Sequence, residues 1–224
     1  MAETSDGKLR FILGFGLFFV ALWLLWNTPV VYPLKIFVVL LHEVSHAIAA
    51  VATGGTLDHI TLDPLQGGAT YFTGGNAFVA LNAGYLGSLA WGGLLFTAGQ
   101  SKWIRKDWIN GLIGVSVILL TVFFVRNPFG IAFGVIFGLA MVAASREMGQ
   151  AMNRRLLLTL GLTSALYAIL DIKSDVLDRP ELTQSDAAVL ADMLGISTVA
   201  VGLVWITIAV AFSVWMMSRA YRDA

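Results

Sequence analysis

Three ionisable residues, His42, Glu43 and His46, stand alone in the otherwise uncharged segment between Lys35 and Asp58. Residues four apart project from one face of a helix, so two imidazoles at this spacing can bind one zinc ion. The adjacent carboxylate points elsewhere and is placed to take a proton from a zinc-bound water. This is the His-Glu-x-x-His pattern of zinc metalloproteases, with His42 and His46 as ligands and Glu43 as the general base.

Chance, or packing stabilised by hydrogen bonds, could also bring these residues together. However, two of the three histidines of the chain fall in this short motif. A carboxylate at the centre of a bilayer helix costs about 2.5–3.5 kcal/mol, which favours a functional interpretation. The third histidine, His59, is expected to be a surface or hairpin residue.

A catalytic zinc site usually has three protein ligands and one open position. The chain contains no cysteine, so the third ligand must be Asp, Glu or a remote His. Asp171 ends an apolar segment near the depth of His46, which lies roughly 9 Å from the end of its own segment, and is the preferred candidate. Asp175, one turn later on the same face, stays open as an alternative, and either could instead be a helix-end charge.

The composition indicates a membrane protein. Of 224 residues, 58% are apolar and 12% charged, against about 25% charged in a soluble domain, and the mean hydropathy is +0.80. These values exclude a soluble globular protein and a disordered one. The 14 basic residues are balanced by 14 acidic ones, so nucleic acid is not an expected partner.

Seven segments are long and apolar enough to cross a bilayer, which takes about 20 residues. The fold class is therefore an all-α polytopic membrane protein, a bundle of about six to seven transmembrane helices forming one domain over residues 1–224. The first segment could also be a signal peptide, but bulky Leu24, Leu25 and Trp26 occupy the place of a cleavage site, which favours a retained helix. The predicted spans are 11–31, 33–52, 77–98, 108–125, 128–145, 156–171 and 196–218.

Two connections carry structure of their own. Residues 58–62 and 69–73 predict two short strands around a turn at 63–68, so a β-hairpin follows the zinc-binding helix. Ser185 has the character of a helix N-cap, and apolar residues share one face up to Gly195. This pattern predicts a short helix that lies on the membrane surface.

Positive charge is unevenly divided between the two sides of a seven-span topology. Positive-inside counting places the richer side in the cytoplasm and the N-terminus outside. The richer side collects Lys35, Lys102, Arg105, Lys106, Arg146, Arg154, Arg155, Arg219 and Arg222. The other side collects Lys8, Arg10, Arg126, Lys173 and Arg179.

Several stretches of the chain resemble the site-2 protease family of intramembrane zinc metalloproteases, in the compact branch that lacks a PDZ domain. The matching stretches are His42–Ala47, Thr53–Gly55, Gly67–Thr70, Asn82–Gly87, Leu170-Asp171, Arg179 and Ser185–Ala187. The resemblance implies a helical bundle that holds Zn²⁺ within the membrane and cleaves other membrane proteins in or near their transmembrane segments. It also implies an Asp ligand in a Leu-Asp-Gly context, where this chain has Leu170-Asp171 followed by Ile172.

The resemblance also gives the hairpin a role, because a substrate helix must unwind before its amide bonds can be hydrolysed. The edge of a strand within 56–73 could capture the unwound segment by β-augmentation, or the hairpin could be an ordinary interfacial one. Asn82 could hydrogen-bond the substrate or, equally, a neighbouring backbone carbonyl.

The sequence therefore predicts an integral, multi-pass zinc metalloendopeptidase, with the bacterial cytoplasmic membrane as its expected location. The expected ligands are His42, His46 and Asp171, and the expected partners are the lipid bilayer and a membrane protein substrate with a transmembrane segment. Two alternatives remain: an inactive protease-derived scaffold that binds membrane partners, and a membrane protein that transports or senses metal.

Overall fold

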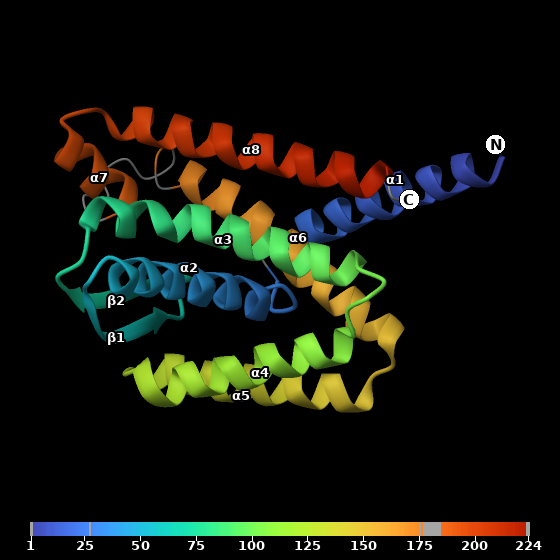
Figure 1. Ribbon diagram of the computed structural model, residues 1–224, viewed down its shortest axis with the longest axis horizontal. Coiled ribbons are helices and arrows are strands. Elements are labelled where there is room, and N and C mark those ends of the chain that lie inside the picture. The colour runs from blue at the N-terminus through green and yellow to red at the C-terminus, as the bar shows by residue number, and fades with distance from the viewer. Residues whose placement is uncertain (1, 27, 175, 177–184, 223–224) are drawn as a thin grey trace.

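A computed structural model describes residues 2–26, 28–174, 176 and 185–222, with the backbone alone for 2–8, 10 and 11 (Figure 1). These described residues form eight helices and one antiparallel hairpin. The elements in chain order are α1 (Ala2–Leu25), α2 (Tyr32–Ala52), β1 (Thr56–Asp63), β2 (Gly67–Thr73), α3 (Ala77–Gln100), α4 (Lys106–Phe124), α5 (Pro128–Glu147), α6 (Gln150–Lys173), α7 (Asp186–Leu194) and α8 (Thr198–Arg222).

Six of the helices in the described part of the chain, α2 to α6 and α8, are long and apolar enough to cross a membrane. The expected all-α polytopic fold is thus confirmed, with six candidate spans. The apolar part of α1, Ile12–Leu25, is shorter than a span, and whether it crosses remains a prediction. The expected end of the first segment at residue 31 was wrong, because the helix ends at Leu25. Pro29 lacks an amide hydrogen and disfavours helical backbone just before it.

Helix α2 lies at the centre of the bundle and carries the predicted motif. It begins at Tyr32 with Pro33 in its first turn, where the missing amide hydrogen costs nothing. Its apolar residues, with Ile36, Phe37 and Leu40 almost completely buried, form the largest hydrophobic core together with α6 and the hairpin. Because α2 is packed on several sides, its polar side chains face protein and the pocket described below rather than lipid.

The hairpin follows α2 as predicted and is longer than the sequence indicated. Its register runs from Thr56 opposite Thr73 to Asp63 opposite Gly67. The outer edge of β1 is occupied by the α4–α5 connection: the Arg126 amide donates to Ile60, and the Asn127 side chain bonds both the amide and the carbonyl of Leu62. Among the described residues no element pairs with the other edge of β2, so the hairpin has one free strand edge.

The predicted short helix after the sixth span is α7. The Ser185 hydroxyl accepts a hydrogen bond from the Ala188 amide, and Gly195 ends the helix in a left-handed conformation with φ of 66°. The predicted N-cap at Ser185 and the predicted helix end at Gly195 are therefore confirmed. Leu190 packs with Trp205 of α8 in a separate core, which attaches α7 to the bundle. Its location on the membrane surface stays a prediction.

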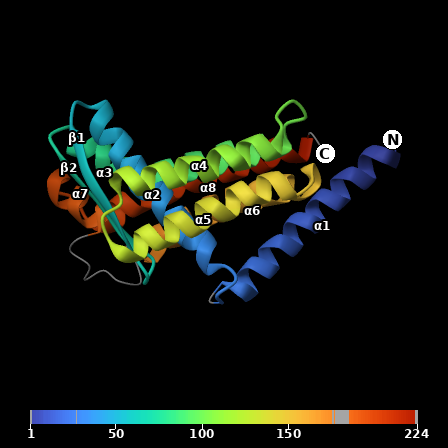
Figure 2. The same ribbon diagram turned by 90° about the horizontal axis from the view of Figure 1, so that it is seen from below.

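The bundle is elongated, and its two ends are built differently. One end carries the hairpin, α7 and the beginning of α3 (Figure 1), and the other carries the α3–α4 and α5–α6 connections. The N-terminal end of α1 and the C-terminal end of α8 both lie toward this second end (Figure 2). Helix ends on the same side are consistent with the six candidate spans described above.

Candidate metal centre

His42 and His46 lie one turn apart on α2, and their rings are in contact, with centroids 4.7 Å apart. The Nε2 atoms of both rings converge on one oxygen of Asp186, at the start of α7. The distances to Asp186 Oδ2 are 2.9 Å from His42 and 3.1 Å from His46. Within the described residues these three side chains form the one group whose donor atoms, all within 4.8 Å of one another, could hold a metal ion.

The hydrogen bonding of His46 prepares its Nε2 atom for a cation. Its Nδ1 atom lies 2.8 Å from the carbonyl oxygen of Ala80, which can only accept, so the ring hydrogen is on Nδ1. In the neutral ring Nε2 then carries a lone pair and faces a carboxylate oxygen, an arrangement that needs a positive charge between the two atoms. A backbone carbonyl that fixes the tautomer in this way is typical of histidines that bind metals.

Two histidine nitrogens and one carboxylate oxygen match the donor set of catalytic zinc sites. Ca²⁺ and Mg²⁺ prefer oxygen ligands throughout, so the two imidazoles disfavour them. The residues present therefore fit a borderline-soft divalent cation. Burial opposes ionisation of Asp186, but its interactions with His42 and His46 outweigh this effect and hold the pKa of that carboxyl well below its usual range.

Glu43 is buried beside the two histidines and is held by the hairpin. The hydroxyl of Thr70, on β2, lies 2.8 Å from Glu43 Oε2 and 2.9 Å from the Glu43 carbonyl oxygen. On the same strand, Gly68 lies directly against the carboxylate. A side chain at this position would collide with it, because a Cβ would lie 2.6 Å from Glu43 Oε1. The hairpin therefore positions the side chain that the sequence predicted as general base.

Helix α3 supports the imidazoles from the other side. Tyr85 packs edge-on against the His42 ring at 4.8 Å and also contacts Trp205. Next to it, Gly84 has no side chain and lets α3 lie directly against both rings. A Cβ at Gly84 would lie 2.6 Å from Cε1 of His42 and 2.6 Å from Cε1 of His46. The metal centre thus depends on the absence of a side chain at this position.

Replacing Gly84 with Ala is therefore expected to displace both imidazoles and lower zinc affinity about 10–100-fold, the range seen when groups that orient metal ligands are changed. Alanine favours helix formation by about 1 kcal/mol over glycine, so a lower zinc affinity in this variant cannot result from a less stable α3. Competition with a chromogenic chelator measures the affinity. Gly14→Ala, on the open side of α1, is the matched control and should bind zinc as the wild type does. Unchanged zinc affinity in Gly84→Ala would contradict this role.

The other predicted residues occupy clear positions. Asp171 lies on the wall of the same pocket as His42 but outside the group of three, and its role as a ligand stays a prediction. Asp175 lies outside the described residues. His59 is on the hairpin, bonded to Asp58 at 3.0 Å and stacked on Tyr71, in agreement with the surface interpretation.

Asn82 has partners within the protein, which favours the second of its two interpretations. Its amide nitrogen donates to the Phe78 carbonyl oxygen at 2.8 Å, and its Oδ1 accepts from Trp205 Nε1 at 2.8 Å. Asp186 was not proposed as a ligand from the sequence, although it lies in a stretch that resembles the protease family. The one local signal was its place directly after the predicted N-cap Ser185.

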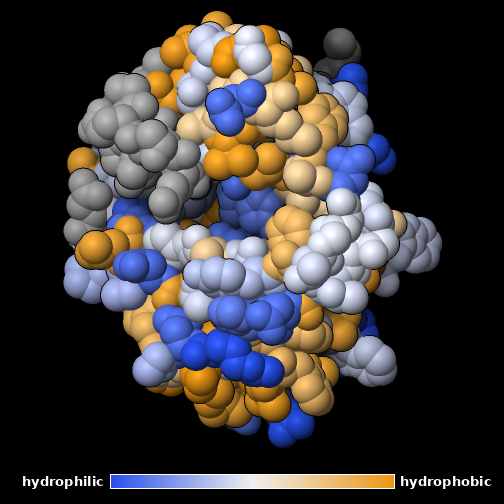
Figure 3. All heavy atoms as spheres, turned by 90° about the vertical axis from the view of Figure 1, so that its left-hand side faces the viewer, coloured by the Kyte–Doolittle hydropathy of each residue, from blue (hydrophilic) through white to orange (hydrophobic). Residues whose placement is uncertain are grey.

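A pocket of about 1030 Å³ surrounds the metal centre and opens at the end of the bundle that carries the hairpin. Figure 3 shows this end as a hollow with hydrophilic residues in its depth and hydrophobic residues along part of its rim. The turn of the hairpin, including Leu65 and Gln66, forms one wall, and Tyr167 and Asp171 of α6 form another. Water can therefore reach a site that lies within the length of a membrane-spanning helix.

Fold and site together define a class: a polytopic helical membrane protein with a His, His, Asp group that could hold a metal ion and an adjacent glutamate in the same pocket. A family model described as Peptidase M50B-like matches residues 16–216, and the chain belongs to this family. The protein is thus an intramembrane metalloprotease by class. No PDZ domain is found in these 224 residues. No curated protein and no solved structure matches the chain.

Proposed function

We propose that the protein is a zinc endopeptidase that hydrolyses a peptide bond in or near a transmembrane segment of another membrane protein. The observation that carries this proposal is the convergence of His42, His46 and Asp186 beside Glu43 in one hydrophilic pocket. When bound, a zinc ion supplies Lewis-acid polarisation of the scissile carbonyl and makes water a stronger acid. His42, His46 and Asp186 would hold this ion.

Glu43 performs the proton transfers of the reaction. Its carboxylate accepts a proton from the attacking water, whose oxygen bonds to the carbonyl carbon of the substrate. The same carboxyl then gives the proton to the amide nitrogen as the carbon–nitrogen bond breaks, which leaves a carboxylic acid and an amine and restores the Glu43 carboxylate. The Thr70 hydroxyl keeps the carboxylate oriented through both transfers, because it donates to Oε2 from a strand packed on α2.

The free edge of β2 is the proposed docking site for the unwound substrate. The edge of β1 is already used by the α4–α5 connection, so of the two strands described it is β2 that offers unpaired backbone groups to an added strand. Gly68 and Thr70 of this strand contact Glu43, so a segment paired with β2 would run past the general base. Substrate capture and positioning for hydrolysis would thus be one event.

Removal of the metal tests the proposal. Purified protein reconstituted with single-span membrane proteins is expected to cleave at least one of them. A chelator should abolish cleavage, and Zn²⁺ should restore it while Mg²⁺ does not, because the site offers two nitrogen donors. Chelation should also lower the unfolding temperature, since metal at 100 times its dissociation constant stabilises a fold by about 2.7 kcal/mol.

Two other results would each favour an alternative. A protein that binds membrane partners but holds no zinc and cleaves none of them would be a protease-derived scaffold. Zinc flux into proteoliposomes would indicate a transporter. The described residues offer one metal-binding group rather than a series along the bundle, and this supports the peptidase over transport.

A further inference from the structure

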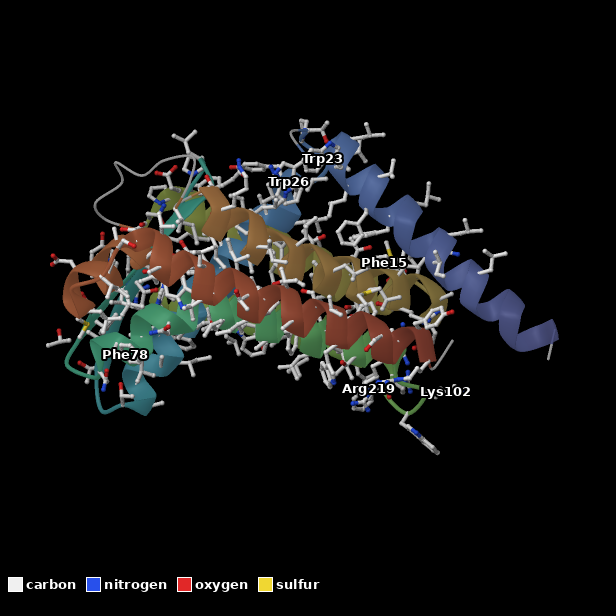
Figure 4. The ribbon with its side chains drawn as sticks, turned by 90° about the horizontal axis from the view of Figure 1, so that it is seen from above. Phe15, Trp23, Trp26, Phe78, Lys102 and Arg219 are labelled. Carbon is white, nitrogen blue, oxygen red and sulfur yellow. The ribbon has the colours of Figure 1, made fainter. Side chains whose placement is uncertain are left out.

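The two ends of the bundle carry opposite charge. The end opposite the pocket is rich in Lys and Arg, which come from the α3–α4 connection and from the adjoining ends of α4, α5, α6 and α8. Figure 4 shows Lys102 and Arg219 at this end, far from Phe78 at the beginning of α3. We call this end the cationic end; its residues are Lys102, Arg105, Lys106, Arg146, Arg154, Arg155, Arg219 and Arg222.

The pocket end has the reverse balance among the described residues. Its part of the hairpin and α7 carry Asp58, Asp186 and Asp192 and no Lys or Arg, while Asp63 lies at the hairpin turn near Tyr32. The described cations there are Lys173, at the end of α6, and Arg126. The Arg126 guanidinium is hydrogen-bonded to the last carbonyl oxygens of α4, so it caps that helix.

The metal centre lies in the half of the bundle nearest the acidic end. His46 is six residues before Ala52, the last residue of α2, which corresponds to about 9 Å along the helix. A membrane span is about 30 Å, so the reacting atoms lie within one leaflet of the bilayer. The beginning of α7, which lines the pocket, lies on this end, whereas the hairpin turn, the wall described above, reaches back toward Tyr32 at the start of α2.

We propose that the pocket opens on the side of the membrane away from the cytoplasm. Lys and Arg in short connections and near span ends are retained on the cytoplasmic side, which assigns the cationic end to the cytoplasm. The N-terminal end of α1 lies toward the same end, so it is placed in the cytoplasm and not outside, where the seven-span count put it. Given the proposed peptidase function, the substrates are membrane proteins whose scissile bond lies in the non-cytoplasmic half of a transmembrane segment or just beyond it.

Single-cysteine labelling tests the orientation independently of catalysis. The chain has no cysteine, so each introduced thiol is the only one. Asp58→Cys marks the pocket end, where the Asp58 side chain is 75% exposed, and Trp103→Cys marks the cationic end, where Trp103 is 95% exposed. A membrane-impermeant maleimide applied to intact cells should label the first variant and leave the second unlabelled until the membrane is permeabilised.

The reverse pattern, or equal labelling of both variants in intact cells, would overturn the proposal. The unsubstituted chain is the matched control and should take no label. For any substrate that is cleaved, mass spectrometry of the fragments should place the cut in its non-cytoplasmic half, and a cut in the cytoplasmic half would also refute the proposal. A chain that cleaves nothing would defeat the peptidase function and its substrate class, whereas labelling would still decide the orientation.

Discussion

Replacement of Glu43 by Gln is expected to abolish proteolysis while the protein keeps its bound metal. Gln has the size of Glu, so it fits over Gly68, where there is no space for a larger group. Its carbonyl oxygen can still accept the Thr70 hydroxyl, but its amide cannot take a proton from water. General acid–base catalysis contributes typically about 10²–10⁴-fold, and the loss of rate should fall in that range. Cleavage of a reconstituted substrate and zinc content measure the two effects side by side.

The same substitution at Glu147 is the matched control. Glu147 is the last residue of α5, exposed at the end of the bundle away from the pocket, and Glu147→Gln should cleave at the wild-type rate. If Glu43→Gln cleaves within tenfold of wild type with zinc bound, another group transfers the proton and the mechanism proposed above is wrong. If it loses zinc as well as activity, Glu43 supports the metal site rather than the proton transfers alone.

The sequence predicted those parts of the site whose geometry is local. The spacing of His42 and His46 fixes their relation as soon as the segment is helical, and the apolar residues around them require a helix. The strand pattern after α2 and the capping signals at Ser185 and Gly195 are equally local, and the structure contains both the hairpin and α7. The family resemblance, which also depended on short motifs, is confirmed over most of the chain.

The partner of the two histidines could not be predicted in the same way. Asp171 was chosen because the depth of a residue along a span can be counted from the sequence. Which face of α6 points to α2 depends on how that helix is rotated in the bundle, and no short pattern in the sequence gives this rotation. Asp186 lies 144 positions from His42, and its place depends on the packing of Leu190 against α8.

The position of Thr70 against Glu43 depends on long-range packing too. The sequence predicted a strand and offered its edge to a substrate, without a link to the general base. The link arises because β2 packs against α2, where Gly68 leaves space for the carboxylate. The end of α1 was misjudged for a different reason, since the apolar residues up to Val31 outweighed the effect of Pro29 on the backbone.

Loss of the Asp186 carboxylate is expected to have the second large effect, a fall in zinc affinity of at least about 100-fold. Mutation of a group that only orients a metal ligand lowers metal affinity about 10–100-fold, and mutation of the ligand itself should lower it further. Asp186 Oδ2 faces both Nε2 atoms, whereas Asp171 lies on the wall of the pocket. Asp186→Ala should therefore lose zinc during dialysis against a weak chelator, and Asp171→Ala should retain it. Zinc content of the dialysed proteins is the measurement.

Asp192→Ala provides the control for the same substitution in the same helix, because Asp192 is exposed on α7 and away from the metal centre. Asp186 also lies in the first turn of α7, where a negative charge favours the helix by typically 0.3–1 kcal/mol. Thermal unfolding monitored by circular dichroism separates this effect from loss of the ligand. If Asp171→Ala is depleted of zinc while Asp186→Ala remains loaded, the ligand expected from the sequence is the correct one. The contact between Asp186 and the histidines would then be an ion pair beside the metal centre.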